Sequence, residues 1–181
     1  TQLFGDRMYI ANATGCSSIW GGSAPSTPYT KNKDGKGPAW ANSLFEDNAE
    51  YGYGMFLAQN TIRKRTIAKV LELSKTTKAK ELKAACEEYL STIDCGKSNS
   101  PATDALIAAL KKSKTKASEE ILKDADYLRK KSMWIFGGDG WAYDIGFSGL
   151  DHVLAQGEDV NIFVFDTEVY SNTGGQSSKS T

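Results

Sequence analysis

The chain has 181 residues, roughly the length of one domain at about 150 residues each, and it carries 22 Lys and Arg against 22 Asp and Glu. This even balance gives no electrostatic reason to expect nucleic acid or an anionic membrane as a partner. The sequence has no apolar run of membrane-spanning length, and its first residues lack the plan of a signal peptide. We expect a soluble cytoplasmic protein that binds a small ligand. Its abrupt start and stop suggest a fragment of a longer protein.

The cysteines do not suggest a disulfide framework. Cys16, Cys86 and Cys95 are odd in number, and none of them belongs to a CxxC pair. Cys86 and Cys95 are interpreted as ordinary thiols of a helix and a helix end. Cys16 differs in setting because it follows a predicted strand in a turn of small residues. Taken alone, it would be a buried thiol.

The N-terminal part predicts a strand followed by a ligand-facing loop. Residues 7–14, "RMYIANAT", form a short β-rich run that delivers the loop at 14–28 to a surface. Loops at strand ends are where ligands commonly bind. Residues 30–40, "TKNKDGKGPAW", are polar and glycine-rich and predict a linker or flexible turn.

A long helix is predicted from residue 42 onward, where large apolar side chains recur at helical spacing. Asn42 or Ser43 would cap this helix and leave acidic residues in its first turn. We expect a break near Gly52 and Gly54.

Residues 76–131 differ in composition, being rich in Ala, Lys and Glu. They predict three short amphipathic helices, broken at 94–101, "DCGKSNSP", and near 113–118, "SKTKAS". Because acidic residues are interleaved with the lysines, these lysines are interpreted as a solvated helix face. We expect a helical insertion or lid packed on the outside of a sheet, with no chemistry of its own.

The C-terminal part predicts a β-α-β unit. Two apolar runs of strand length, 133–138 "MWIFGG" and 161–166 "NIFVFD", flank a segment at helical spacing. Such a unit has parallel strands and a right-handed crossover, which places the chain in the α/β class. The loops that follow the two strands therefore face the same side.

The first of these loops suits a diphosphate with a divalent metal. Gly138 and Gly140 lack a Cβ, so phosphate oxygens can approach the backbone, and the following helix presents unpaired amides. Asp139 between them supplies a carboxylate oxygen of the kind that Mg²⁺ prefers. The second loop adds the Thr167 hydroxyl, a backbone carbonyl near Val169 and the Asn172 amide. GDG alone is a weak motif, but its placement between a strand and a helix strengthens it.

These residues carry a family resemblance. "GGDGWAYDIGFSGLDHVLAQGEDVNIFVFDTEVYSNTGGQSSKST" resembles the thiamine-diphosphate-binding segment of pyruvate:ferredoxin oxidoreductases. "IANATGCSSIWGGSAPSTPYT" and "GPAWANSLFEDNAEYGYGM" resemble the preceding stretch of the same family, in order. The resemblance implies a Rossmann-like parallel-sheet domain for thiamine diphosphate over residues 1–181, partial, with a helical insertion at about 76–131.

The resemblance also implies roles for individual residues. Asp139, Thr167 and the Val169 carbonyl would be the Mg²⁺ ligands, and Asn172 would be the catalytic residue beside the thiazolium. Cys16 would ligate a [4Fe–4S] cluster whose other cysteines lie outside this chain, as does the glutamate that activates the cofactor. The remaining residues implied to lie along the cofactor are Thr14, Ser17, Ser18, Gly138, Gly140, Tyr143, Asp144 and Ile145.

The implied activity is oxidative decarboxylation of pyruvate to acetyl-CoA and CO₂ with coenzyme A. Electrons would pass through iron–sulfur clusters to ferredoxin or flavodoxin. The implied partners include the other domains of the parent chain and a second copy in a homodimer, so the fragment alone should be inactive. The compartment would be the cytoplasm, or a hydrogenosome-like organelle.

Two alternatives stay open. The chain could come from another 2-oxoacid oxidoreductase or from a pyruvate:NADP⁺ oxidoreductase. In a different class, it could be a noncatalytic nucleotide-binding or interaction module that uses a Rossmann-like sheet. That second reading lacks a GxGxxG turn or a P-loop.

Overall fold

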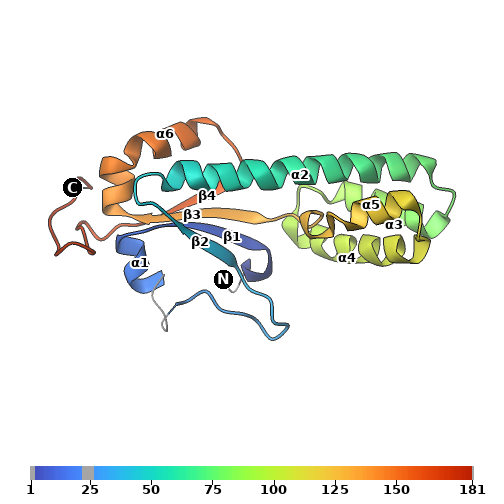
Figure 1. Cartoon of the computed structure of the whole chain (residues 1–181), viewed down its shortest axis with the longest axis horizontal. Helices are drawn as coiled ribbons and strands as arrows, with labels where there is room; N and C mark the ends of the chain where they lie inside the picture. Colours follow the sequence, from blue (N-terminus) through green and yellow to red (C-terminus); the bar gives the residue numbers. More distant parts are fainter. Residues whose placement is uncertain (1–2, 22–26, 181) are drawn as a thin grey trace. The chain divides into compact units, whose positions relative to one another are not determined.

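The computed structural model describes residues 3–21 and 27–180, which fall into two compact units (Figure 1). One unit combines residues 1–56 with 132–181, and the other comprises residues 57–131. The second unit thus begins at Leu57, well before the expected insertion at about 76. Residues 22–26 of the predicted 14–28 loop lie outside the described residues.

Four parallel strands form the sheet of the first unit, within the described part of the chain. The sheet has the order β2-β1-β3-β4, so the expectation of a parallel α/β sheet is confirmed. The strands predicted at 7–14, 133–138 and 161–166 are present, with bounds that differ by one residue at most ends. The strands are β1 (Met8–Ala13), β2 (Ala39–Ser43), β3 (Ser132–Gly138) and β4 (Val160–Phe165).

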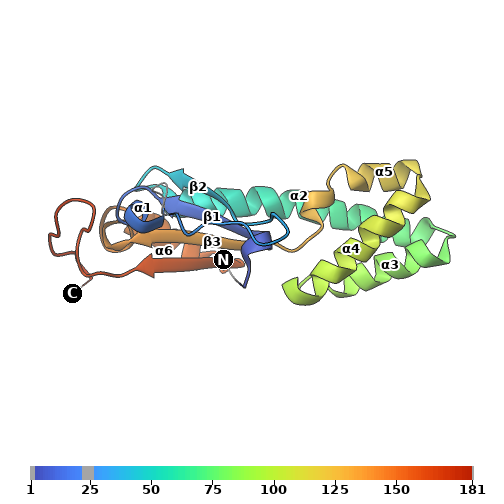
Figure 2. The same ribbon diagram turned by 90° about the horizontal axis from the view of Figure 1, so that it is seen from below.

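Helices cover both faces of this sheet. Helix α1 (Cys16–Gly21) lies on one face, and α6 (Phe147–Ala155) lies on the other with the first turns of α2 (Asn48–Thr76) (Figures 1 and 2). Right-handed crossovers require this arrangement, because the chain moves one way across the sheet from β1 to β2 and the other way from β2 through β3 to β4. A π-helical segment, Gly140–Ile145, precedes α6.

The start of α2 differs from the prediction. Asn42 and Ser43 do not cap the helix, because β2 continues to Ser43 in parallel pairing with Ala13 of β1. The helix instead begins at Asn48, whose buried side chain donates to the Phe136 carbonyl at 2.9 Å and accepts from the Ser43 hydroxyl at 2.8 Å. Asn48 therefore ties the helix start to β2 and β3.

The predicted break near Gly52 and Gly54 is wrong, because α2 runs without interruption from Asn48 to Thr76. Gly52 faces the sheet, where an added Cβ would lie 2.6 Å from the Ile135 side chain and 3.1 Å from the Ala11 Cβ. This glycine allows close helix-to-sheet packing rather than a bend. Gly54 has no neighbour within 4 Å of an added Cβ.

The second unit is helical, as expected. It holds the rest of α2 with α3 (Lys80–Ser91), α4 (Gly96–Ser113) and α5 (Lys116–Leu122), packed around a buried apolar cluster that includes Cys86. The break expected over 94–101 is too long, because α4 begins at Gly96 and continues through Pro101. Ala102, Thr103 and Leu106 are buried on one face of α4, and this packing holds the segment helical despite the proline.

The two glycines of α2 give a matched test of this packing. We expect Gly52→Ala to destabilise the chain by about 1–3 kcal/mol, because the methyl group has no space beside Ile135. Gly54→Ala should instead stabilise it by about 0.5–1 kcal/mol through helix propensity alone. Urea unfolding of the two variants measures both effects. Equal shifts in the same direction would contradict the packing.

Candidate functional site

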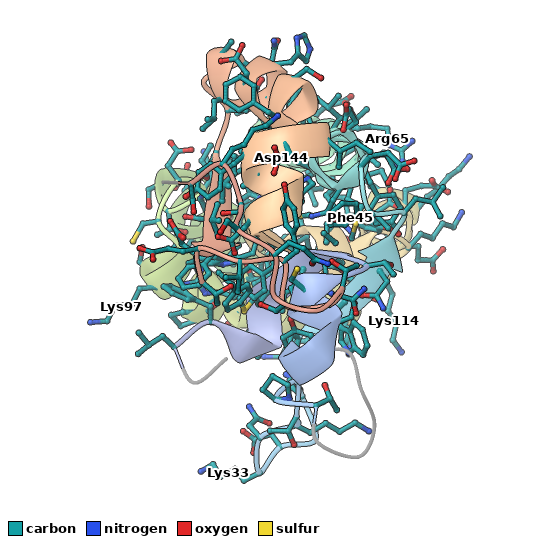
Figure 3. The ribbon with its side chains drawn as sticks, turned by 90° about the vertical axis from the view of Figure 1, so that its left-hand side faces the viewer. Lys33, Phe45, Arg65, Lys97, Lys114 and Asp144 are labelled. Atoms are coloured by element: carbon teal, nitrogen blue, oxygen red, sulfur yellow. The ribbon has the colours of Figure 1, made fainter. Side chains whose placement is uncertain are left out.

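The two predicted loops meet at one edge of the sheet. Asp139 follows β3 and Thr167 comes two residues after β4, and these strands are neighbours paired in register through Gly138 and Phe165. Figure 3 looks onto this edge, where Phe45 and Asp144 are labelled. The expectation that both loops leave the carboxyl ends of parallel strands on the same side is therefore confirmed.

The carboxylate of Asp139 is fully buried and binds the second loop. Its Oδ2 accepts hydrogen bonds from the amide and the hydroxyl of Thr167, at 3.0 and 3.1 Å. Its Oδ1 accepts from the Glu168 amide at 2.8 Å and the Ser178 hydroxyl at 3.3 Å. Burial raises the pKa of Asp139, but the hydrogen bonds from Thr167 and Glu168 outweigh burial and hold the pKa below its ordinary value of 3.8.

Three oxygens expected to bind Mg²⁺ converge here. Thr167 Oγ1 lies 3.1 Å from Asp139 Oδ2 and 3.2 Å from the Val169 carbonyl oxygen. Neighbouring ligands of an octahedral Mg²⁺ at about 2.1 Å are roughly 3.0 Å apart, so both separations fit one coordination shell. The backbone reaches this geometry with Glu168 at a φ of 62°, in the left-handed region.

The donor set lacks a second carboxylate. Among the described residues, no three His, Cys, Asp or Glu side chains gather as a metal-binding group. One carboxylate with neutral oxygens suits Mg²⁺ that keeps phosphate and water ligands. This set of donors does not suit a metal that is held by protein side chains alone.

A cavity of about 490 Å³ is lined by Gly140 and Tyr170, the residues that follow Asp139 and Val169 in the chain. Asp139, Thr167 and Val169 do not line the cavity themselves. Six residues that the sequence assigned to the site line it, from the loops after β1 and β3 and from the loop after β4. The full lining consists of Thr14, Gly15, Cys16, Phe45, Gly140, Asp144, Ile145, Tyr170, Asn172 and Thr173.

Other expected residues lie outside this lining. Ser17 is fully buried and donates to the Ala13 carbonyl at 2.8 Å, while the Ser18 hydroxyl accepts from the Gly15 amide. Both side chains therefore hold the turn into α1. Tyr143 donates to Asp166 at 2.8 Å, and this hydrogen bond raises the pKa of Tyr143.

Gly138 does not line the cavity, and its missing side chain leaves room for Cys16. A Cβ on Gly138 would lie 2.6 Å from the Cys16 Cβ, so the backbone of β3 abuts the first loop. Cys16 is partly exposed at the cavity wall, whereas Cys86 is buried and Cys95 is exposed. Burial raises the pKa of Cys86 to about 11.

The loop after β4 forms a hairpin that carries Asn172. Val169 pairs with Ser177 in an antiparallel bridge, and the Tyr170 amide donates to the Gln176 carbonyl at 2.8 Å. Gly174 and Gly175 have φ values of 111° and 80°, which only glycine adopts readily. The hairpin is thus a defined structure that holds Asn172 at the cavity.

Sequence reasoning missed a polar cluster on the cavity wall. The Tyr170 hydroxyl donates to Asp144, and Lys179 forms an ion pair with the same carboxylate at 3.1 Å. The hydrogen bond from Tyr170 and the charge of Lys179 lower the pKa of Asp144.

Two further contacts were missed as well. Ser178 bonds Asp139, and Phe45 forms part of the cavity wall. Both Ser178 and Tyr170 belong to the quoted motif, but their spacing gave no sign of their partners.

Cofactor-binding α/β domains commonly bind their ligand at the carboxyl ends of parallel strands, as the cavity is placed here.

No protein-family model matches the chain. None of its described helices has the length and apolar character to span a membrane.

Comparison with known proteins shows which proteins contain a homologous segment. Over its whole length the chain is 58% identical to a pyruvate-flavodoxin oxidoreductase of Klebsiella pneumoniae and 58% identical to the pyruvate:ferredoxin oxidoreductase of Moorella thermoacetica, and it spans 16% of each. It is also 52% identical to the mitochondrial pyruvate dehydrogenase [NADP(+)] of Euglena gracilis and spans 10% of that protein. The chain is homologous to one segment of the pyruvate:ferredoxin and pyruvate-flavodoxin oxidoreductases.

The lowered pKa of Asp139 predicts a pH dependence of stability. A carboxylate with a depressed folded-state pKa stabilises the fold above its unfolded-state value, and this contribution is lost as the pH falls through the folded-state pKa. We expect the urea midpoint to fall on acidification below about pH 4, and to fall less steeply in Asp139→Asn. Asp151→Asn, on the exposed side of α6, is the control. Parallel pH profiles for the chain and Asp139→Asn would contradict the hydrogen-bonded carboxylate.

Proposed function

We propose that the carboxyl edge of the sheet binds thiamine diphosphate together with Mg²⁺. The observation that carries this proposal is the convergence of Asp139 Oδ2, Thr167 Oγ1 and the Val169 carbonyl beside a cavity of about 490 Å³. The three oxygens would hold the metal, and diphosphate oxygens would complete its shell. The resemblance of the two loops to the thiamine-diphosphate segment of the family supports the same assignment.

The residues of this chain would bind and orient the cofactor. Gly140 lets the rings of Phe45 and Tyr170 pack against its backbone, since they lie 3.0 and 3.3 Å from the position of an added Cβ. Asn172 carries a neutral amide at the cavity wall and would donate to an oxygen of the substrate. Tyr170 and Lys179 fix the Asp144 carboxylate on the same wall. When bound, thiamine diphosphate supplies the electron sink for decarboxylation of a 2-oxoacid.

The parent enzyme would oxidise pyruvate. Its balanced reaction converts pyruvate, coenzyme A and two oxidised one-electron carriers to acetyl-CoA, CO₂, a proton and two reduced carriers. Cys16 would supply one thiolate of a [4Fe–4S] cluster on the electron path, with the other ligands from the rest of the parent chain. Its partial exposure at the cavity wall is compatible with that role.

The electron acceptor has two candidates. Relatives that share this segment include enzymes named for ferredoxin, for flavodoxin and for NADP⁺. The segment is therefore common to enzymes with different electron acceptors. Carrier proteins are the first candidate, because relatives at 56–58% identity are named for them.

In either case the enzyme would work with the other domains of its chain, in the cytoplasm or an organelle.

The metal site is tested by Asp139→Asn in the full-length parent enzyme. We expect the affinity for thiamine diphosphate with Mg²⁺ to fall at least about tenfold, because the only carboxylate in the proposed shell is lost. Isothermal titration calorimetry measures this affinity. Asp151→Asn is the control, since Asp151 is an exposed carboxylate of α6. Unchanged affinity in Asp139→Asn would remove this residue from the site.

Cys16→Ala tests whether Cys16 ligates the iron–sulfur cluster without taking part in cofactor binding. In the parent enzyme we expect it to keep cofactor binding, to lose iron and the EPR signal of one reduced cluster, and to abolish pyruvate-dependent ferredoxin reduction. Cys95→Ala, in the helical unit, should change none of these. A Cys16→Ala enzyme with full iron content and normal ferredoxin reduction would return this thiol to a packing role.

A further inference from the structure

The balanced charge of the chain is divided unevenly between its two units. Residues 57–131 carry 17 Lys and Arg against 10 Asp and Glu, a net charge of +7. The remaining residues carry 5 against 12, a net charge of −7. The zero net charge of the whole chain thus conceals a strongly cationic helical unit.

Seven lysines gather at one end of this unit. Helix α2 ends and α3 begins at 76–80, and α4 ends and α5 begins at 113–116. Both connections lie at the same end of the helical unit in Figures 1 and 2, and Leu73, Leu82 and Leu110 near them share one buried cluster. We call these residues the lysine tip: Lys75, Lys78, Lys80, Lys111, Lys112, Lys114 and Lys116.

The charge of the lysine tip is not neutralised. All seven side chains are exposed, and none forms an ion pair with a described residue. Other lysines of the unit do, since Lys69 pairs with Asp124 and Lys123 with Glu120. The acidic residues within segments 75–81 and 111–120 are Glu81, Glu119 and Glu120, against seven lysines. Of these, Glu120 is ion-paired with Lys123, and the charge of Lys116 also lowers the pKa of Glu120. Such a patch steers an anionic partner and speeds its association.

We propose that the lysine tip is a docking surface for an acidic electron-carrier protein, a proposal that rests on the proposed function. Complexes between electron-carrier proteins and their enzymes bury small interfaces and are transient. Charge complementarity therefore contributes much of the recognition between the two proteins. Segments 75–81 and 111–116 contain no aromatic residue to stack on bases, which disfavours single-stranded nucleic acid. Those segments also lack large apolar side chains that would insert into a membrane.

The test uses the full-length parent enzyme with Lys111→Glu and Lys114→Glu combined. Its acceptors are a ferredoxin and a flavodoxin of net negative charge, with methyl viologen as a small acceptor that needs no docking surface. We expect the KM for each carrier to rise roughly tenfold at low ionic strength and to depend less on salt, with kcat and viologen reduction unchanged. Lys111→Gln with Lys114→Gln should give a smaller rise.

Lys64→Glu with Lys97→Glu is the matched control, because it reverses two exposed charges of the same unit outside the tip. An unchanged KM for the carriers, or an equal rise in the tip and control variants, would overturn the docking surface. So would a changed oligomeric mass without a change in carrier KM, which would assign the tip to a contact between copies. Equal losses with viologen and carriers in both tip variants would overturn it too. Failure of the unaltered enzyme to reduce viologen with pyruvate would instead refute the proposed function.

Discussion

The buried carboxylate of Asp139 holds the candidate site together. An ionised group without exposed surface is unfavourable unless hydrogen bonds replace its water. Here the Thr167 amide and hydroxyl, the Glu168 amide and the Ser178 hydroxyl supply those bonds. Every one of these donors comes from the loop after β4. The position of that loop, and with it the Val169 carbonyl and Asn172, therefore depends on the carboxylate at the end of β3.

The parallel sheet makes this contact available. Because β3 and β4 are neighbours in register up to Gly138 and Phe165, their following loops start side by side. Close packing then places the first loop against the same point, since the Gly138 backbone leaves room for Cys16. The proposed cofactor site thus draws on the loops after β1, β3 and β4. The lining of one cavity brings together Cys16, Asp144 and Asn172 from these three loops.

Sequence patterns predicted the parts of the fold that depend on local periodicity. They gave the β-α-β unit, the shared edge for its two loops and the three short helices. They failed where tertiary contacts decide, as at Gly52, which reads as a helix breaker but serves close packing against Ile135. The Tyr170 and Lys179 contacts with Asp144 span 26 and 35 residues and have no periodic signature. Likewise, the lysines of 75–80 and 111–116 form one patch only after the helices fold back on one another.

The most direct test of the proposed site replaces Mg²⁺ with Mn²⁺ in the full-length parent enzyme with bound thiamine diphosphate. Anomalous scattering from a crystal of that complex locates the metal independently of the protein density. We predict a peak about 2.1 Å from an Asp139 carboxylate oxygen, Thr167 Oγ1 and the Val169 carbonyl oxygen, with diphosphate oxygens in the same shell. A metal bound elsewhere, with the Asp139 carboxylate still closed on the Thr167 and Glu168 amides and outside its coordination shell, would contradict the proposed site.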